Sequence, residues 1–119
     1  MASEFVAFIV DQLAPLPELT AGRFFGGTAL RAQGALFAMV MSDVLYFAVD
    51  DASRAAYERR GSRCFSYATR KGRIDVKRFY EAPADALEDA DELLALARAA
   101  IGAAQRKAAA KPRRPAAKA

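Results

Sequence analysis

The sequence has no histidine and only one cysteine, Cys64, among its 119 residues. Without histidine, the chain lacks the commonest metal ligand and the side chain that most readily exchanges protons near neutral pH. A single cysteine excludes an intramolecular disulfide and cannot form a thiolate metal cluster by itself. We therefore expect no metal, no cofactor and no catalytic residue, and the cysteine usage fits a reducing, cytoplasmic location.

Long apolar runs are also missing. The longest covers residues 34–41, far short of the roughly 20 residues that a membrane-spanning helix needs. The N-terminal segment carries Glu4 and Asp11 and has no basic start, so it does not have the pattern of a signal peptide. We expect no membrane partner.

The charged residues are distributed unevenly along the chain. Every charged residue from position 106 onward is basic, which leaves 12 basic against 14 acidic residues in the rest of the sequence. Prolines and like charges favour disorder in this last segment. The composition predicts one folded domain over residues 1–105 and a basic, Lys/Ala/Pro-rich disordered tail over residues 106–119.

Three segments have the pattern of helices. Apolar residues recur every four positions from Phe5 to Leu13, which predicts a helix over residues 3–14, with Ser3 as its N-cap. Acids at residues 50–51 and a glycine at position 61 bound a second helix. Asp89 and the acid three positions later form a capping-box-like start for a long last helix.

Between these helices the sequence predicts five strands. We expect residues 23–32 to form a single strand, in which Gly26-Gly27 makes a bulge or a close backbone approach. The run 35–41 has the pattern of a strand buried on both faces, and Ser42-Asp43 turns the chain into the third strand. Two further strands flank a basic turn at residues 70–73. The order α-β-β-β-α-β-β-α predicts an α+β fold, with helices packed on an antiparallel five-stranded sheet.

The segment from residue 23 to residue 47, RFFGGTALRAQGALFAMVMSDVLYF, resembles the signature of the TfoX (Sxy) N-terminal domain family. The signature has an Arg, an aromatic or Met, Phe-Gly-Gly, a glycine, Phe-Ala and Asp-x-Leu-Tyr. The matching residues are Arg23, Phe25, Gly26, Gly27, Gly34, Phe37, Ala38, Asp43, Leu45 and Tyr46, followed downstream by Phe65, Ser66, Tyr67, Tyr80, Pro83, Leu87 and Asp89. The resemblance covers roughly residues 5–104 and implies the same element order.

The resemblance also implies a function. The members that give the family its name regulate natural competence and act as transcription coactivators together with the cAMP receptor protein. From this resemblance we expect a non-enzymatic regulatory module whose partner is DNA or a DNA-bound transcription regulator.

Several residues admit both a chemical and a structural interpretation. Gly26-Gly27 could contact a phosphate, but such loops lie between a strand and a helix start, and strand-like sequence follows here. Arg63 could activate Cys64 as a redox-sensitive thiol, although a small core residue is the favoured interpretation. An enzyme would need a pocket that gathers Asp43, Tyr46, Cys64, Tyr67 or Tyr80, and nothing in the sequence indicates that these residues converge.

The aromatic residues also allow two interpretations. They could stack on nucleic-acid bases, but aromatic residues in strands more often build a core. An apolar sheet face that no helix covers would need a partner, which favours a homodimer.

Basic residues supply the strongest functional indication. Residues 54–78 contain nine basic residues against two acids, which forms either a solvated surface or a phosphate-facing patch. The tail either contacts phosphates without reading bases or only solubilises the chain. The candidate nucleic-acid-binding residues are Arg59, Arg60, Arg63, Arg70, Lys71, Arg73, Lys107, Lys111, Arg113, Arg114 and Lys118.

Two functions follow from these observations. The first is a regulatory module that contacts DNA non-specifically through its basic tail. The alternative is a homodimerising protein-interaction domain with no direct role at nucleic acid.

Overall fold

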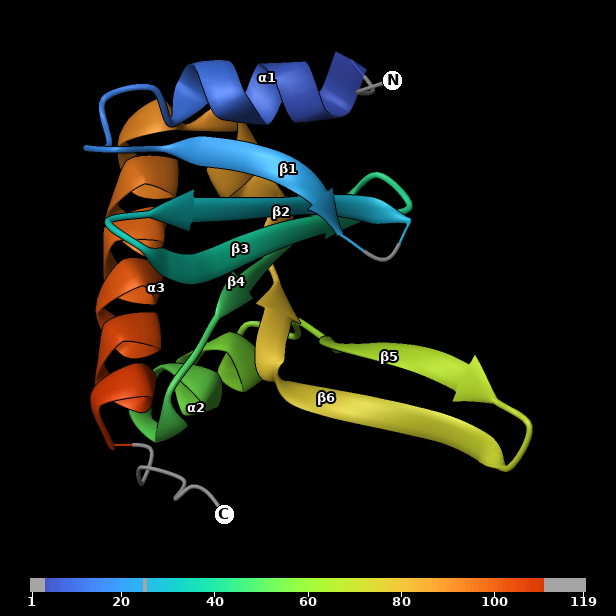
Figure 1. Ribbon diagram of the computed structural model, residues 1–119. Helices are drawn as coiled ribbons and strands as arrows, with labels where there is room; N and C mark the ends of the chain where they lie inside the picture. The colour runs from blue at the N-terminus through green and yellow to red at the C-terminus, as the bar shows by residue number, and fades with distance from the viewer. Residues whose placement is uncertain (1–3, 25, 111–119) are drawn as a thin grey trace, which may run out of the picture.

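A computed structural model of the chain describes residues 4–24 and 26–110. Within these ranges the chain forms helices and strands that pack as an α+β domain (Figure 1). In chain order the elements are α1 (Glu4–Gln12), β1 (Thr20–Phe24), β2 (Gly27–Ala32), β3 (Ala35–Met41), β4 (Val44–Ala48), α2 (Asp51–Arg59), β5 (Cys64–Thr69), β6 (Gly72–Glu81), the 3-10 helix η1 (Ala84–Glu88) and α3 (Ala90–Ala110).

The sheet has six strands in the order β1-β2-β3-β4-β6-β5, and every neighbouring pair is antiparallel. The prediction of five strands, with a single strand over residues 23–32, is therefore wrong. Phe24 pairs with Gly27, so the chain reverses between them and β1 folds back along β2. Gly26 has φ +84°, a conformation that glycine adopts without strain.

Of the two alternatives predicted for Gly26-Gly27, a bulge or a close backbone approach, Gly27 confirms the close approach. A Cβ atom at this position would lie 2.3 Å from the Val40 carbonyl oxygen in β3. The other signature residues are spread over the sheet: Arg23 lies in β1, Phe37 and Ala38 lie in β3, and Leu45 and Tyr46 lie in β4. Gly34 and Asp43 lie in hairpin turns with positive φ. Phe25 lies outside the described residues.

One face of the sheet packs against α3. Figure 1 shows this helix crossing the strands at a steep angle where it lies against β3 and β4, while α1 lies beside β1 at the top of the view. The fully buried side chains at this interface include Phe37 and Phe47 from the sheet and Leu93 and Ala97 from α3. The apolar run of β3 is buried at most positions, as its sequence predicts.

Local signals place the ends of α2 and α3. The Asp50 carboxylate accepts a hydrogen bond from the Ser53 N–H at 2.9 Å, and Asp89 accepts one from the Glu92 N–H at 3.1 Å. Both predicted helix starts are confirmed. Helix α3 continues to Ala110, so the first residues of the predicted tail are helical. Residues 111–119, like the predicted N-cap Ser3, lie outside the described ranges.

The far half of the β5–β6 hairpin leaves the rest of the sheet. β6 pairs with β4 only from Phe79 to Glu81, and its register with β5 shifts, with Cys64 opposite Tyr80 but Phe65 opposite Val76. Figure 1 shows the hairpin projecting beyond the helices. We call residues 65–76 the arm and the other described residues the body. No helix in the described ranges is long and apolar enough to cross a membrane.

Candidate interaction surface on the arm

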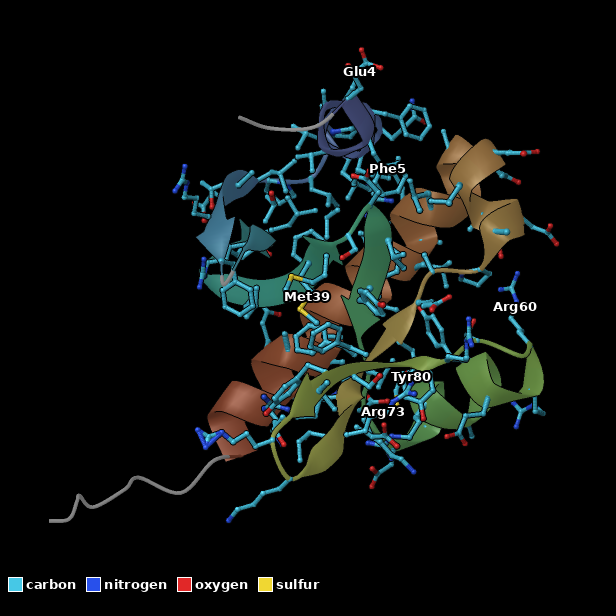
Figure 2. The ribbon with its side chains drawn as sticks, turned by 90° about the vertical axis from the view of Figure 1, so that its right-hand side faces the viewer. Glu4, Phe5, Met39, Arg60, Arg73 and Tyr80 are labelled. Atoms are coloured by element: carbon cyan, nitrogen blue, oxygen red, sulfur yellow. The ribbon has the colours of Figure 1, made fainter. Side chains whose placement is uncertain are left out.

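The predicted basic site residues lie at three places. Arg59 and Arg60 lie at the end of α2, Arg63 precedes the arm, and Lys107 lies in the last turn of α3. Arg70 and Lys71 form the tip of the arm, and Arg73 follows in β6. Figure 2 shows Arg60 and Arg73 on separate parts of the molecule. Lys111, Arg113, Arg114 and Lys118 lie outside the described residues.

The end of α2 is partly neutralised. Arg60 donates to the Glu92 carboxylate of α3 at 3.0 Å, which ties the two helices together. Gly61, with φ +83°, lets the chain leave the helix, and its N–H donates to the Glu58 carbonyl at 3.0 Å. Arg59 is exposed, and no carboxylate of the described residues lies within ion-pair distance of it. Of Arg59 and Arg60, Arg59 is therefore the more available to bind an anion.

The tip of the arm is a fixed turn that carries unneutralised charge. The Thr69 hydroxyl donates to the Gly72 carbonyl at 2.8 Å and accepts from the Lys71 N–H at 3.2 Å. Arg70 and Lys71 are exposed, and within the described ranges neither forms an ion pair. Behind the tip, Arg73 donates to the Ser66 hydroxyl at 3.0 Å and lies 3.7 Å from the Asp75 carboxylate.

The base of the arm adds two exposed cations, Lys77 and Arg78, that the candidate site did not include. The Lys77 carbonyl accepts from Arg54 Nε at 3.0 Å, and the Arg78 carbonyl accepts from the Val49 N–H at 2.9 Å. These main-chain bonds hold the bend of β6 against α2 and β4. Both cations were counted in the excess of basic residues over residues 54–78. That excess is the sequence signal from which Lys77 and Arg78 could have been added to the candidate site.

One face of the arm is apolar. Phe65 packs edge-on against Tyr46 of β4, with ring centroids 5.2 Å apart, and Tyr67 follows at 6.1 Å from Phe65. Ile74 pairs with Tyr67 across the hairpin. Tyr67 is 49% exposed and Ile74 43% exposed. A core role was the favoured interpretation of the strand aromatic residues, which include Tyr67, so the exposure of Tyr67 is a finding of the structure.

Three of the five residues considered for catalysis lie near the base of the arm: Cys64 pairs with Tyr80, and Tyr46 of β4 packs on Phe65, the residue after Cys64. Asp43 lies in the β3–β4 turn and Tyr67 lies on the arm, so the five do not form one pocket. The Tyr80 hydroxyl donates to the Glu58 carboxylate at 2.5 Å, and burial together with this bond raises its pKa to about 12. The Tyr80 hydroxyl is therefore protonated near neutral pH.

A polar hollow of about 290 Å³ lies elsewhere, between residues 60–62 and 81–85, and none of those five residues lines it. The described side chains also contain no cluster of three or more acids or cysteines that could hold a metal ion.

The model of the TfoX N-terminal domain family matches residues 11–104. This range includes every strand of the sheet, α2 and most of α3. No curated protein matches the chain.

Proposed function

The chain belongs to the TfoX N-terminal domain family, and on this basis we propose that it is a non-enzymatic regulatory module of transcription. In this proposal the module is cytoplasmic and acts at DNA, directly or through a DNA-bound regulator, in competence or a related process. The observation that carries the proposal is the family membership. The exposed cations at the arm and at the end of α2 support contact with DNA.

The chemistry of these cations fits phosphates better than bases. Arg59, Arg70 and Lys71 are exposed on short or turning segments, and no helix or strand presents them as a set that could enter a groove. Contacts of this kind give affinity without sequence specificity and weaken steeply as salt increases. The basic residues from 106 onward would add contacts of the same type.

A duplex-DNA titration tests this proposal. We expect the full chain to bind at about 50 mM salt and to lose at least tenfold in affinity at about 200 mM salt. A chain that ends at residue 110 keeps α3 complete, and we expect it to bind more weakly and with a smaller salt dependence. No binding by the full chain at the lower salt concentration would refute direct DNA contact.

Charge-removal variants locate the contact. Arg70→Gln, Lys71→Gln and Arg73→Gln together should reduce the salt slope, because each lost phosphate contact removes about 0.9 from it. The matched control removes three exposed cations of the body with Arg23→Gln, Arg31→Gln and Arg98→Gln. If both triple variants lose the same affinity, the net charge and not the arm determines binding.

The second candidate is a protein-interaction domain without a direct role at DNA, with a second copy of the chain as its simplest partner. The exposed apolar pair Tyr67 and Ile74 favours it, because such side chains mark interaction sites when they lie side by side. Sedimentation over a range of protein concentrations tests it: a dimer that is lost when Tyr67 and Ile74 become serine supports this function, and a monomer throughout contradicts it.

A further inference from the structure

The arm ends in an open strand. β5 is the last strand of the sheet and pairs with β6 on one side only. Its sequence, CFSYAT, contains no charged residue and no proline, which are the usual protections of an edge strand against pairing. The opposite edge strand, β1, carries the exposed Arg23. β5 is therefore the edge better suited to accept another strand.

The register shows which main-chain groups remain available. Thr69 and Gly72 flank the two-residue turn at the tip, and the pair that flanks such a turn is hydrogen-bonded. Hydrogen-bonded pairs alternate along an antiparallel ladder. Ser66 and Ala68 therefore direct their N–H and C=O groups to the open edge, where no other strand of the described residues lies.

The two faces beside this edge differ in chemistry. On one face Phe65, Tyr67 and Ile74 form the apolar surface described above. On the other face Arg73 pairs with the small residue Ala68, and its guanidinium lies over β5, where Nε donates to the Ser66 hydroxyl at 3.0 Å. An added strand would meet apolar groups on one face and a cation on the other.

The charge around β5 selects the partner. Arg63, whose side chain is 81% exposed and lies 4.0 Å from the Glu81 carboxylate, precedes the strand. Arg70 and Lys71 follow it, and Asp75 is the acid of the arm. A second copy would bring like charges together: antiparallel pairing about Tyr67 sets Arg63 of one copy opposite Lys71 of the other, which is destabilising. An acidic strand would instead place carboxylates beside these cations.

We propose that the open edge of β5 binds an extended acidic segment of a protein partner as an additional strand of the sheet. Main-chain hydrogen bonds to Ser66 and Ala68 give affinity, and side chains that alternate between apolar and acidic give specificity. The apolar side chains pack on Tyr67, and the carboxylates reach Arg73 and the cations at the two ends of β5. This inference goes beyond the proposed function and requires no contact with DNA.

The probe is a fluorescein-labelled peptide of about eight residues, long enough to span β5, in which valine alternates with glutamate. Two control peptides separate the contributions. In one, lysine replaces glutamate; in the other, alternate backbone nitrogens are methylated, which removes the donors without changing the charge. Fluorescence anisotropy measures binding to the full chain. We expect the glutamate peptide to bind and both controls to bind at least tenfold more weakly.

Two pairs of protein variants localise the site. Ala68→Pro removes the outward N–H of β5, and Ala21→Pro is its matched control in the exposed edge strand β1. Tyr67→Ser removes the apolar anchor, and Phe8→Ser removes an aromatic ring of similar exposure from α1. Circular dichroism checks that each variant folds. We expect the β5 variants to lose at least tenfold in peptide affinity and the controls to stay within about twofold.

Each outcome decides the proposal. Failure of the glutamate peptide to bind the full chain, or equal binding of the methylated peptide, overturns it. Undiminished binding by a folded Ala68→Pro variant also overturns it, and Tyr67→Ser keeps the test open if the proline variant does not fold. A concentration-dependent dimer that Ala68→Pro abolishes would assign the edge to a second copy instead. Because Ala68→Pro changes no charge, it should leave DNA affinity unchanged, so this proposal and the DNA proposal can fail separately.

Discussion

The body and the arm belong to one sheet but differ in what covers them. In the body, β3 and β4 lie against α3, and Phe37 and Phe47 are fully buried. In the arm, β5 and β6 pair with each other, and the end of the hairpin from Tyr67 to Asp75 is exposed. The same main-chain ladder therefore supports a core in one region and a free surface in the other.

This difference separates stability from recognition. Burial of apolar side chains is the dominant favourable contribution to folding, and most of it lies in the body. The arm contributes few buried contacts, so the fold constrains its side chains less than it constrains those of the body. It follows that substitutions in the body should change the free energy of unfolding, and substitutions in the arm should change binding.

The largest effect is expected in the body. Phe47→Ala removes a fully buried ring that packs on Phe37, with ring centroids 6.4 Å apart. We expect it to lower the free energy of unfolding by about 3–5 kcal/mol, measured by urea denaturation. Phe8→Ala is the matched control, because the Phe8 ring is 41% exposed and its loss should cost about 1 kcal/mol or less. Equal costs would mean that α3 does not define the core.

A smaller loss is expected where two strands of the body touch. In Gly27→Ala the new Cβ would meet the Val40 carbonyl oxygen at 2.3 Å and the Met41 sulfur at 2.4 Å, so β2 and β3 must move apart. We expect a cost of about 1–3 kcal/mol in the same denaturation experiment. Gly22→Ala is the control in β1, because its Cβ would meet nothing within 4 Å. Its stability should stay within about 0.5 kcal/mol of the original.

Sequence patterns predicted most of the body for physical reasons that are local. Helix starts at Asp50 and Asp89 need only a carboxylate within reach of a free N–H, and the continuous apolar run of β3 can be buried only on two faces. β1 was missed because its residues, TAGRF, neither alternate nor form an apolar run. The positive φ of Gly26, which makes the turn, is a property of the pairing between β1 and β2.

The candidate site was less accessible from sequence. The residue types at Arg70, Lys71 and Arg73 indicated a charged turn, which the structure contains. Periodicity could not show that Tyr67 and Ile74 stay exposed, because alternation reveals which side chains share a face but not whether anything covers that face. Covering depends on where β6 leaves β4, and this coincides with the register shift that leaves residues 77–79 without a partner in β5.

The body and the arm each contain an ion pair whose contribution to stability can be compared, Asp50–Arg106 in the body and Asp75–Arg73 in the arm. The Asp50 carboxylate caps α2 and accepts a hydrogen bond from Arg106 of α3 at 2.6 Å. The hydrogen bond from the Ser53 N–H, together with the Arg106 side chain, lowers the pKa of Asp50 to about 2. Because the folded pKa lies below the unfolded value of 3.8, the carboxylate stabilises the fold above about pH 4, and this contribution disappears as the pH falls toward 2.

Asp50→Ala should therefore cost about 1–2 kcal/mol near neutral pH and progressively less in acid, as measured by urea denaturation at several pH values. Asp50→Asn keeps a capping acceptor, so it should recover part of the neutral-pH stability without the pH dependence. Asp75→Asn, in the exposed arm pair, should cost less than about 0.5 kcal/mol. A larger loss from Asp75→Asn than from Asp50→Ala would reverse the comparison.

The smallest effect on stability is expected on the apolar face of the arm. Ile74→Thr keeps a β-branched side chain and removes a cross-strand contact with Tyr67, which should cost about 0.5 kcal/mol or less. Hydrogen exchange should also show faster opening of the arm amides than of the β3 amides, because few buried contacts hold the arm. If Ile74→Thr lowers the free energy of unfolding as much as Phe47→Ala does, or if the arm amides exchange slowly, this face belongs to the core. If the cost is small, folding does not require an apolar side chain at this exposed position, and the side chain is available to bind a partner as proposed above.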